Sequence, residues 1–408
     1  MRAFLQRSLG CVLWVLVVTS LAHGGDVKFG IDVLRESNFE AVAGKRLGLV
    51  MNPASVDSRL VSTADVLAQT DRCKLVALFG PEHGIYGAAY AGAKVDDQPR
   101  DPRTGVPVYS LYGGKGRKPS EKVRQGLDAL LFDLQDIGCR SYTYLSSMKL
   151  CMDACAESDI EFVVLDRPNP LGGNRVEGPM LKDGFQSFVS YLPVPYVHGM
   201  TMGELAQFVQ KKYHPNYKKL RVIKMSGWKR EMIWEDTGRQ WVPTSPHVPE
   251  ARSAASYVST GILGELYVIN IGVGYTQPFE ICGAPWIDGD ALAHAMNAQG
   301  PKNVTYRPLH FVPFYGTFLT LPCEGVQVHL DPRTAENLVE INYRLIQTLG
   351  AQRLFDAAPK RHQMFDKVSG SDEPRKVLTS GGDLNALFAK WKRECEAFRR
   401  EVKDALIY

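Results

Sequence analysis

A glutamate and a histidine stand in a constrained turn within residues 78–87, LFGPEHGIYG. Glu82 and His83 follow an apolar run, and three glycines and a proline surround them. Glycine adopts backbone conformations that other residues avoid, and proline fixes one torsion angle, so such a turn holds its side chains in place. A positioned carboxyl group can act as a general acid or base. We predict that Glu82 is catalytic, and we count His83 among the substrate-binding candidates, as an orienting group or a histidine that only satisfies the turn.

Two further apolar runs end in ionisable side chains. Residues 129–138, ALLFDLQDIG, end in aspartates and lead into CRSYTY, while residues 162–170, FVVLDRPNP, contain an Asp-Arg pair. If these runs are strands of one parallel sheet, their carboxyl ends meet Glu82 at one edge, where ligands bind. Paired carboxyl groups hydrolyse glycosides, arginine binds carboxylates, and tyrosine offers a flat amphipathic face. The candidates at these two ends are Asp133, Asp136, Arg140, Tyr142, Tyr144, Asp166, Arg167 and Asn169.

Structural roles stay open for some of these residues. Aspartate after a strand often caps the next helix or closes a turn, which applies to both Asp133 and Asp136. Asp166 can equally form an internal ion pair. Other chemistries lack their motifs: the first strand-to-helix turn reads MNPASVD, and no G-x-G-x-x-G opens it, nor does any H-E-x-x-H or G-x-S-x-G occur. We therefore expect neither a cofactor nor a metal ion.

The elements that must position these residues alternate between strands and helices from residue 27 to about 245. Short apolar runs separated by helical segments are typical of a parallel sheet covered on both faces. We predict a doubly wound, Rossmann-like α/β catalytic domain over 25–248 and a smaller α+β domain over 249–408. A proline-rich segment, 243–249, marks the boundary. In the second part the pattern predicts strands at 264–275 and 324–332 and helices at 334–350 and 381–406, the last as a charged, solvated outer face.

Residues 1–24 have the pattern of a secretory signal. Arg2 and Arg7 precede an apolar run at 9–22, and small residues offer a cleavage site near its end. The run is shorter than the ~20 residues that a membrane-spanning helix needs. We therefore predict a secreted or periplasmic protein that is not held in the membrane after cleavage.

The composition of the rest of the chain is that of a globular protein. The net charge is +4, and the basic residues are dispersed, so we expect no nucleic-acid partner. Cys11 lies in the predicted signal, which leaves seven cysteines out of eight. We interpret most of them as buried thiols, with room for one or two disulfides in an oxidising compartment.

Five motifs occur in order: GLVMNPASVD, LFGPEHGIYG, LLFDLQDIGCRSYTY, VVLDRPNPLGG followed by VEGPML, and PFEICGAPW. Together they resemble the family of exo-β-N-acetylmuramidases, once known only as a domain of unknown function, and the resemblance extends over about residues 28–408. It implies a Rossmann-like domain, a smaller C-terminal domain and a site in the cleft between them. It also implies removal of terminal N-acetylmuramic acid from the non-reducing end of peptidoglycan fragments.

The resemblance places the catalytic acid or acid/base at Glu82. It leaves the second catalytic group open among Asp133, Asp136, Asp166 and Tyr142, since some glycosidases use a tyrosine nucleophile. Retention and inversion of configuration are open as well. The motifs add Asn52 and Glu280 to the substrate-binding candidates.

One segment departs from the family pattern. Residues 270–280 read NIGVGYTQPFE where the family has a stretch like SEGRGT before PFE, so Val273 replaces an acidic residue and Tyr275 replaces an arginine. We include Tyr275 among the substrate-binding candidates. The departure keeps two alternatives open, a changed sugar specificity and a muropeptide-binding protein without catalysis. An esterase or amidase acting on a wall substituent is a third, for which the sequence has no nucleophile motif.

Overall fold

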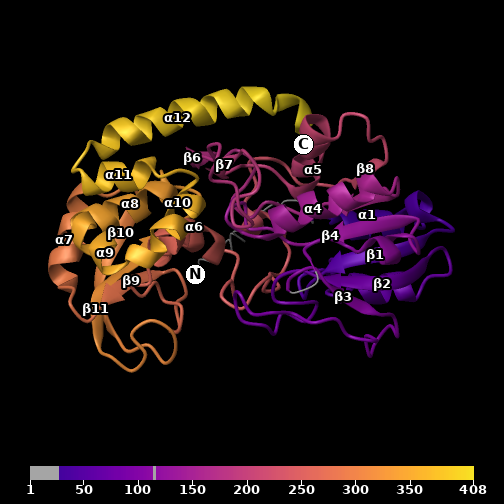
Figure 1. Ribbon diagram of the computed structural model, residues 1–408, viewed down its shortest axis with the longest axis horizontal. Coiled ribbons are helices and arrows are strands. Elements are labelled where there is room, and N and C mark those ends of the chain that lie inside the picture. Colours follow the sequence, from indigo (N-terminus) through magenta and orange to yellow (C-terminus); the bar gives the residue numbers. More distant parts are fainter. Residues whose placement is uncertain (1–26, 114–115) are drawn as a thin grey trace, which may run out of the picture.

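The computed structural model describes residues 27–113 and 116–408, which form two units side by side (Figure 1). The secretory signal predicted at 1–24 lies outside the described residues. The first unit is built on a six-stranded sheet, and every neighbouring pair of its strands is parallel. In spatial order the strands are β3 (Val108–Ser110), β2 (Lys74–Gly80), β1 (Arg46–Met51), β4 (Ala129–Asp133), β5 (Glu161–Leu165) and β8 (Leu220–Ile223).

This strand order confirms the predicted doubly wound fold. The chain proceeds outward from β1 to β2 and β3 on one side and from β4 to β5 and β8 on the other. The order therefore reverses between β1 and β4, and the loops at the carboxyl ends of these two strands diverge there. Such a switch point is the usual ligand site of a doubly wound sheet.

Helices cover both faces of the sheet because its strands are apolar on both sides. In β4, Leu130 and Phe132 pack with α4 and α5, whereas Ala129 and Leu131 pack into a separate core with α1 and α2. Consecutive side chains of a strand point to opposite faces, which explains this division. The helices of the first unit are α1 (Gly30–Glu36), α2 (Thr63–Ala68), α3 (Glu121–Arg124), α4 (Tyr144–Glu157) and α5 (Met202–Tyr213).

The second unit combines a small antiparallel sheet with helices. Its strands lie in the order β10 (Val304–Phe311), β11 (Cys323–Leu330) and β9 (Ile281–Ala284), and β11 confirms the strand predicted at 324–332. The predicted helices at 334–350 and 381–406 correspond to α8 and α12. The helices are α6 (Ser253–Gly264), α7 (Gly289–Gln299), α8 (Leu338–Thr348), α9 (Ala351–Ala357), α10 (His362–Ser369), α11 (Glu373–Thr379) and α12 (Leu384–Glu401).

The strand predicted at 264–275 is wrong. The helix α6 ends at Gly264, and the segment after it forms only an isolated bridge between Asn270 and Gly283. Positive φ angles at Tyr267, Gly272 and Gly274 turn the backbone repeatedly, which an extended strand does not allow.

The last helix connects the two units. Figure 1 shows α12 running from the second unit across to α5 of the first. It packs on the two-stranded sheet of β6 (Glu177–Met180) and β7 (Pro195–Val197). One side of α12 is solvated, as predicted, but the other is a buried apolar stripe. The stripe consists of Leu384, Leu387, Phe388, Trp391, Cys395 and Phe398.

The cysteines of the described residues are all buried, and none of the seven is paired in a disulfide. Burial raises the thiol pKa of Cys73 and of Cys139 to about 11. None of the described helices has both the length and the apolar character needed to cross a membrane.

Candidate active site

The turn after β2 fixes Glu82 by hydrogen bonds from two other segments. Its Oε1 accepts from the backbone N–H of Gly92 at 2.9 Å, and its Oε2 accepts from the Thr143 hydroxyl at 2.8 Å. Glu82 is only 9% exposed. Each carboxyl oxygen thus keeps lone-pair capacity while the group as a whole is held in place.

The backbone of this turn is conformationally constrained, as the sequence predicted. His83 has a φ of 71°, and its Nδ1–H donates to the carbonyl of Ala89 at 2.8 Å. At Gly87 the φ is 67°, and a Cβ atom would lie 2.8 Å from Cγ of Pro53. Glycine at this position therefore lets the turn pack directly on the loop that follows β1.

Asn52 and Tyr144 form the support beneath the turn. Nδ2 of Asn52 donates to the Tyr144 hydroxyl at 3.0 Å and to the Thr244 carbonyl at 2.9 Å, and the Tyr144 hydroxyl donates to the same carbonyl at 2.7 Å. All three groups are buried. Both predicted residues therefore lie at the site, where they tie the loop after β1, the start of α4 and the proline-rich segment together.

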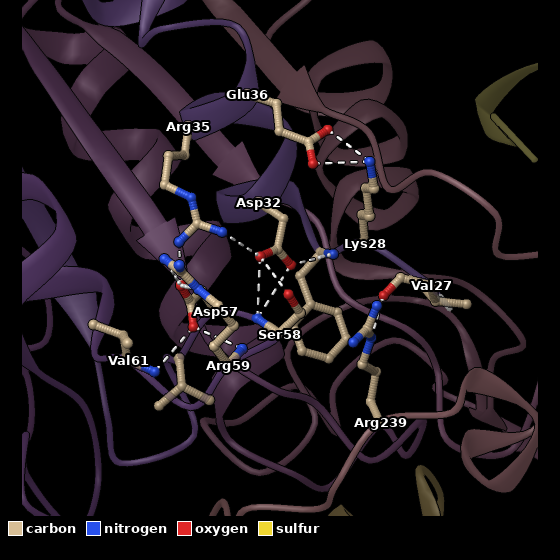
Figure 2. Close-up of polar contacts among 12 residues, drawn as sticks. Val27, Lys28, Asp32, Arg35, Glu36, Asp57, Ser58, Arg59, Val61 and Arg239 are labelled. Carbon is tan, nitrogen blue, oxygen red and sulfur yellow. Dashed lines mark hydrogen bonds and ion pairs between the residues drawn. The ribbon is translucent and has the colours of Figure 1, made fainter. Parts of the chain in front are cut away.

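A polar network braces the loop after β1 against α1 (Figure 2). Asp32 accepts from the backbone N–H and the hydroxyl of Ser58, and Asp57 accepts from the side chains of Arg35 and Arg59. Burial opposes ionisation of Asp57, but hydrogen bonds from the Val61 N–H and from Arg35 lower its pKa. The network fixes the loop that carries Asn52.

The carboxyl group of Asp133, at the end of β4, forms a buried ion pair with Arg167. Nε of Arg167 lies 2.5 Å from its Oδ1 and Nη2 lies 3.0 Å from its Oδ2, which also accepts from the hydroxyl of Thr63. Asp133 is fully buried, and Arg167 also donates to the Val56 carbonyl. Both carboxyl oxygens are used inside the protein, so this geometry favours a structural role for the pair.

Asp166 at the end of β5 is similarly enclosed. Its Oδ1 accepts from the backbone N–H groups of Arg167 and Gly203, and its Oδ2 accepts from the hydroxyls of Thr201 and Tyr408. Burial raises its pKa to about 6. Four protein donors leave no open side for a sugar.

Arg140 and Asn169 also face the protein interior. Arg140 donates to the carbonyls of Pro179, Val194 and Val368, and burial lowers its pKa to about 10. Asn169 donates to the Met200 carbonyl at 3.0 Å and accepts from its own turn. Neither side chain is free to bind a carboxylate of a ligand.

Asp136 differs from the other aspartates because part of its carboxyl group has no partner. Oδ2 accepts from the Gly138 N–H at 2.7 Å, and Nε2 of His198 lies 3.3 Å away without forming a hydrogen bond. The Met200 N–H donates to His198 Nδ1 at 3.2 Å, so a neutral His198 carries its proton on Nε2, toward Asp136.

Four buried polar atoms around Asp136 make no hydrogen bond within the described residues. They are Oδ1 of Asp136, Oε1 of Gln135, the Tyr142 hydroxyl and Nε2 of His198. Buried polar groups are nearly always paired in proteins, so a cluster of unpaired ones indicates a place for ordered water or a ligand. We call these four residues the unpaired cluster.

Tyr142 of the unpaired cluster packs against Tyr144. The rings of Tyr142 and Tyr144 are 4.8 Å apart. Burial raises both phenol pKa values, and the charge of Glu82 contributes at Tyr144 while that of Asp136 contributes at Tyr142. A tyrosine nucleophile needs an accessible phenolate, and the raised pKa of Tyr142 disfavours that form.

The second unit meets the site through His247 of the proline-rich segment. Its Nε2 is hydrogen-bonded to the hydroxyl of Tyr315. Burial lowers the pKa of His247. Because the Thr244 carbonyl of the same segment accepts from Asn52 and Tyr144, this segment links the site to the loop between β10 and β11.

Two predicted residues from the second unit are used in its own packing. The ring of Tyr275 lies 5.4 Å from that of Phe311 and 6.0 Å from that of Phe314. Glu280 lies 3.6 Å from Nη2 of Arg252. The structure therefore brings together Asn52, Glu82, His83, Asp136, Tyr142 and Tyr144, and keeps Asp133, Arg140, Asp166, Arg167, Asn169, Tyr275 and Glu280 in other contacts.

Three residues at the site were not among the predicted ones. Thr143 lies within CRSYTY and could have been found from that motif. His198 follows β7, and nothing in the sequence indicates that β7 lies beside the loop after β4, where the His198 N–H donates to the Gly138 carbonyl. His247 lies in the segment interpreted as a connector.

Two other features of the described residues bear on the choice of site. No group of three or more His, Cys, Asp and Glu side chains could hold a metal ion within 27–113 and 116–408. A cavity of about 1080 Å³ beneath α12 is lined by none of the predicted site residues. Its charged lining includes internal pairs, Arg175 with Glu177 and Arg344 with Glu340.

A doubly wound sheet with carboxyl groups at its switch point, faced by a second unit, is the arrangement of an α/β enzyme with a carboxyl-based site. Family models place this enzyme among the glycoside hydrolases. The N-terminal model of the exo-β-N-acetylmuramidase NamZ matches residues 47–252, and the C-terminal model matches 255–408. The chain belongs to this family, as the sequence motifs predicted.

Individual relatives agree with this assignment. The peptidoglycan β-N-acetylmuramidase NamZ of Bacillus subtilis (strain 168) is 39% identical over 387 residues, which cover 94% of this chain and 91% of the relative. Two crystal structures of DUF1343 family proteins from Bacteroides fragilis NCTC 9343 are similar in fold. They are 43% and 29% identical, with TM-scores of 0.87 and 0.76, and each match covers 94% of this chain and 99% of the other.

Proposed function

We propose that this protein is a secreted exo-acting glycosidase that releases terminal N-acetylmuramic acid from the non-reducing end of peptidoglycan fragments. Family membership and the name of the Bacillus subtilis relative support the reaction and the substrate. The observation that carries a catalytic role for this chain is that a glutamate held by hydrogen bonds, Glu82, and the unpaired cluster around Asp136 both follow strands at the same edge of the sheet.

In the proposed mechanism Glu82 protonates the glycosidic oxygen as the bond breaks. The Gly92 N–H and the Thr143 hydroxyl hold its carboxyl group, and the hydroxyl can turn to donate or accept as the proton leaves. Low exposure of Glu82 limits competition from bulk water. In the second half of the reaction the carboxylate takes a proton from water, if the enzyme retains configuration.

We assign the second carboxyl group to Asp136 rather than to Asp133. Oδ1 of Asp136 makes no hydrogen bond within the described residues, whereas both oxygens of Asp133 are bound by Arg167 and Thr63. His198 beside Asp136 can hold the carboxyl group in place and bind a sugar hydroxyl. Gln135 and Tyr142 supply further polar atoms for the terminal sugar.

The decisive experiment measures release of N-acetylmuramic acid from a muramic-acid–glucosamine disaccharide by mass spectrometry. We expect the parent protein to release it, and Glu82→Gln and Asp136→Asn each to lower kcat by about 10²- to 10⁴-fold with an unchanged melting temperature. Asp133→Asn is the contrasting control, because breaking a buried ion pair costs stability, about 3–5 kcal/mol, rather than kcat alone.

Three outcomes would contradict parts of this proposal. Full turnover by Glu82→Gln would remove the acid/base role from that residue. A loss of kcat in Asp133→Asn without loss of stability would return the second role to Asp133. Binding of the disaccharide by calorimetry without any product would instead support a muropeptide-binding protein.

Localisation and domain limits complete the proposal. We propose that residues 1–24 are removed on secretion, and that a catalytic domain, 25–248, and a C-terminal domain, 249–408, remain. The N-terminal sequence of the protein recovered outside the cytoplasm is expected to begin near Gly25; recovery of the intact chain from the cytoplasm would contradict secretion.

A further inference from the structure

The loop between β10 and β11 exposes a dense group of apolar side chains. We call residues 312–321 the tongue. Ten large hydrophobic side chains are exposed among the described residues, and five of them lie here: Val312, Phe314, Tyr315, Leu319 and Leu321, each 39–57% exposed. Exposed apolar groups that gather in one place mark binding surfaces, whereas scattered ones do not.

The tongue is held in a defined conformation by the segment that departs from the family pattern. The Phe314 N–H donates to the Gly274 carbonyl at 2.9 Å, and Nδ2 of Asn270 donates to the Thr317 carbonyl at 2.8 Å. Tyr275 packs against Phe314 from below. Gly274 has a φ of 95°, and a Cβ there would lie 1.9 Å from the carbonyl oxygen of Tyr315. The residues GVGYT thus build the support on which the tongue rests.

The tongue reaches the candidate active site. Tyr315 is hydrogen-bonded to His247, and their rings are 6.0 Å apart with an interplanar angle of 32°. His247 lies three residues after Thr244, whose carbonyl accepts from Asn52 and Tyr144 at the site. The proline-rich segment therefore joins the tongue to the residues that support the Glu82 turn.

We propose that the tongue, through Phe314 and Tyr315, binds the sugar on the leaving-group side of the scissile bond. This inference rests on the proposed function. In the proposed function the terminal sugar uses the polar atoms near Glu82 and Asp136, so the open apolar surface that the proline-rich segment joins to them is suited to the following sugar. Aromatic rings pack on the apolar face of a pyranose, while the Tyr315 hydroxyl and His247 offer polar contacts at the rim.

The test compares two substrates that share the muramic acid and differ in the leaving group. One is the muramic-acid–glucosamine disaccharide, and the other is the β-fluoride of N-acetylmuramic acid, whose leaving group has no ring. We expect Tyr315→Ala and Phe314→Ala to lower kcat/KM for the disaccharide about 5- to 20-fold relative to the fluoride. Tyr315→Phe keeps the ring, so it is expected to retain most of the parent's preference for the disaccharide over the fluoride, measured as the ratio of the two kcat/KM values. Tyr213→Ala, at the end of α5, is the matched control, because Tyr213 is also 39% exposed.

A second measurement keeps the inference independent of turnover. In a Glu82→Gln background, calorimetry is expected to show about 5- to 20-fold weaker binding of the disaccharide when Tyr315 is replaced by alanine. Equal loss on both substrates, or unchanged disaccharide binding, would overturn the role of the tongue. If the parent protein cleaves neither substrate, the proposed function fails, whereas weakened binding in Tyr315→Ala would still uphold the tongue as a glycan surface.

Discussion

At the scale of single residues, two aspartates that follow neighbouring strands differ in how many hydrogen bonds they accept. Asp166 accepts hydrogen bonds from four protein groups, whereas Oδ1 of Asp136 accepts from none. A fully paired carboxylate is part of the framework, and a partly unpaired one is available to a ligand. This difference depends on Tyr408 and His198, both of which are more than 50 positions away in the chain.

The pH dependence of stability is expected to report on Asp166. Its folded pKa, about 6, lies above the value of 3.8 for an unperturbed aspartate. The folded state binds this proton more tightly, so the contribution of Asp166 to stability is fully present below pH 4 and is lost as the pH rises through 6. In Asp166→Asn the amide oxygen can face the two N–H groups and its nitrogen the two hydroxyls. Between pH 4 and 7, the free energy of unfolding of this variant is expected to fall by about 2 kcal/mol less than that of the parent, as measured by urea unfolding.

Asp128 provides a control of opposite sign. The hydrogen bond and charge of Arg46 lower its pKa, so its contribution is present above the unfolded pKa and lost as the pH falls. Asp128→Asn is expected to reduce the loss of unfolding free energy in acid. It should leave the change in unfolding free energy between pH 4 and 7 as it is in the parent. Parallel pH curves for Asp166→Asn and the parent would contradict the assignment.

At the scale of elements, short loops after parallel strands determine the site. The apolar runs at β1, β2, β4 and β5 could be predicted from the sequence, and with them the meeting of Asn52, Glu82 and Asp136 at one edge. The choice between Asp133 and Asp136 could not, because it depends on which carboxyl group Arg167 pairs with. The tongue could not be predicted either, because it rests on a segment whose composition resembles that of a strand. Gly272 and Gly274 turn that supporting segment instead of letting it extend.

The braced loop after β1 gives a prediction at this scale. Asp57 is fully buried and accepts from Arg35, Arg59 and the Val61 N–H. Asp57→Ala is expected to cost about 3 kcal/mol of unfolding free energy, because it leaves buried donors unpaired. It should also lower kcat, since the loop carries Asn52.

Arg59→Ala is the matched control for this network. The Arg59 side chain is 67% exposed, so its ion pair with Asp57 is screened by solvent and its removal is expected to cost less than about 1 kcal/mol. Equal destabilisation by the two variants, in urea unfolding, would show that the network does not depend on the buried carboxylate.

At the scale of the whole molecule, α12 makes one body of the two units. Its aromatic residue Phe398 packs on Phe208 of α5 with ring centroids 6.2 Å apart, and Tyr408 donates to Asp166 in the first unit. The apolar stripe of α12 has helical spacing and is visible in the sequence. Its partner surface is not, because the stripe packs on α5 and β6, about 200 residues earlier.

Replacing Phe398 by alanine tests this connection. Phe398 is 2% exposed, and removing a buried aromatic ring costs about 3–5 kcal/mol. Calorimetry of the parent is expected to give one unfolding transition, and Phe398→Ala is expected to separate it into two as the units uncouple. Lys211→Ala, which removes an exposed surface pair with Asp404, should leave the transition unchanged. Two transitions in the parent would contradict the connecting role of α12.

The buried, unpaired cysteines have a practical consequence for how this protein behaves outside its native state. A thiol reagent needs an accessible thiolate, and here both accessibility and ionisation are suppressed by the fold. We therefore expect these thiols to resist alkylation and air oxidation in the folded protein, so that the rate of labelling reports the rate of unfolding. Once the chain unfolds, the seven thiols of the described residues become reactive together and can cross-link in combinations that the native core does not accommodate. Refolding therefore requires a reductant that the native protein does without.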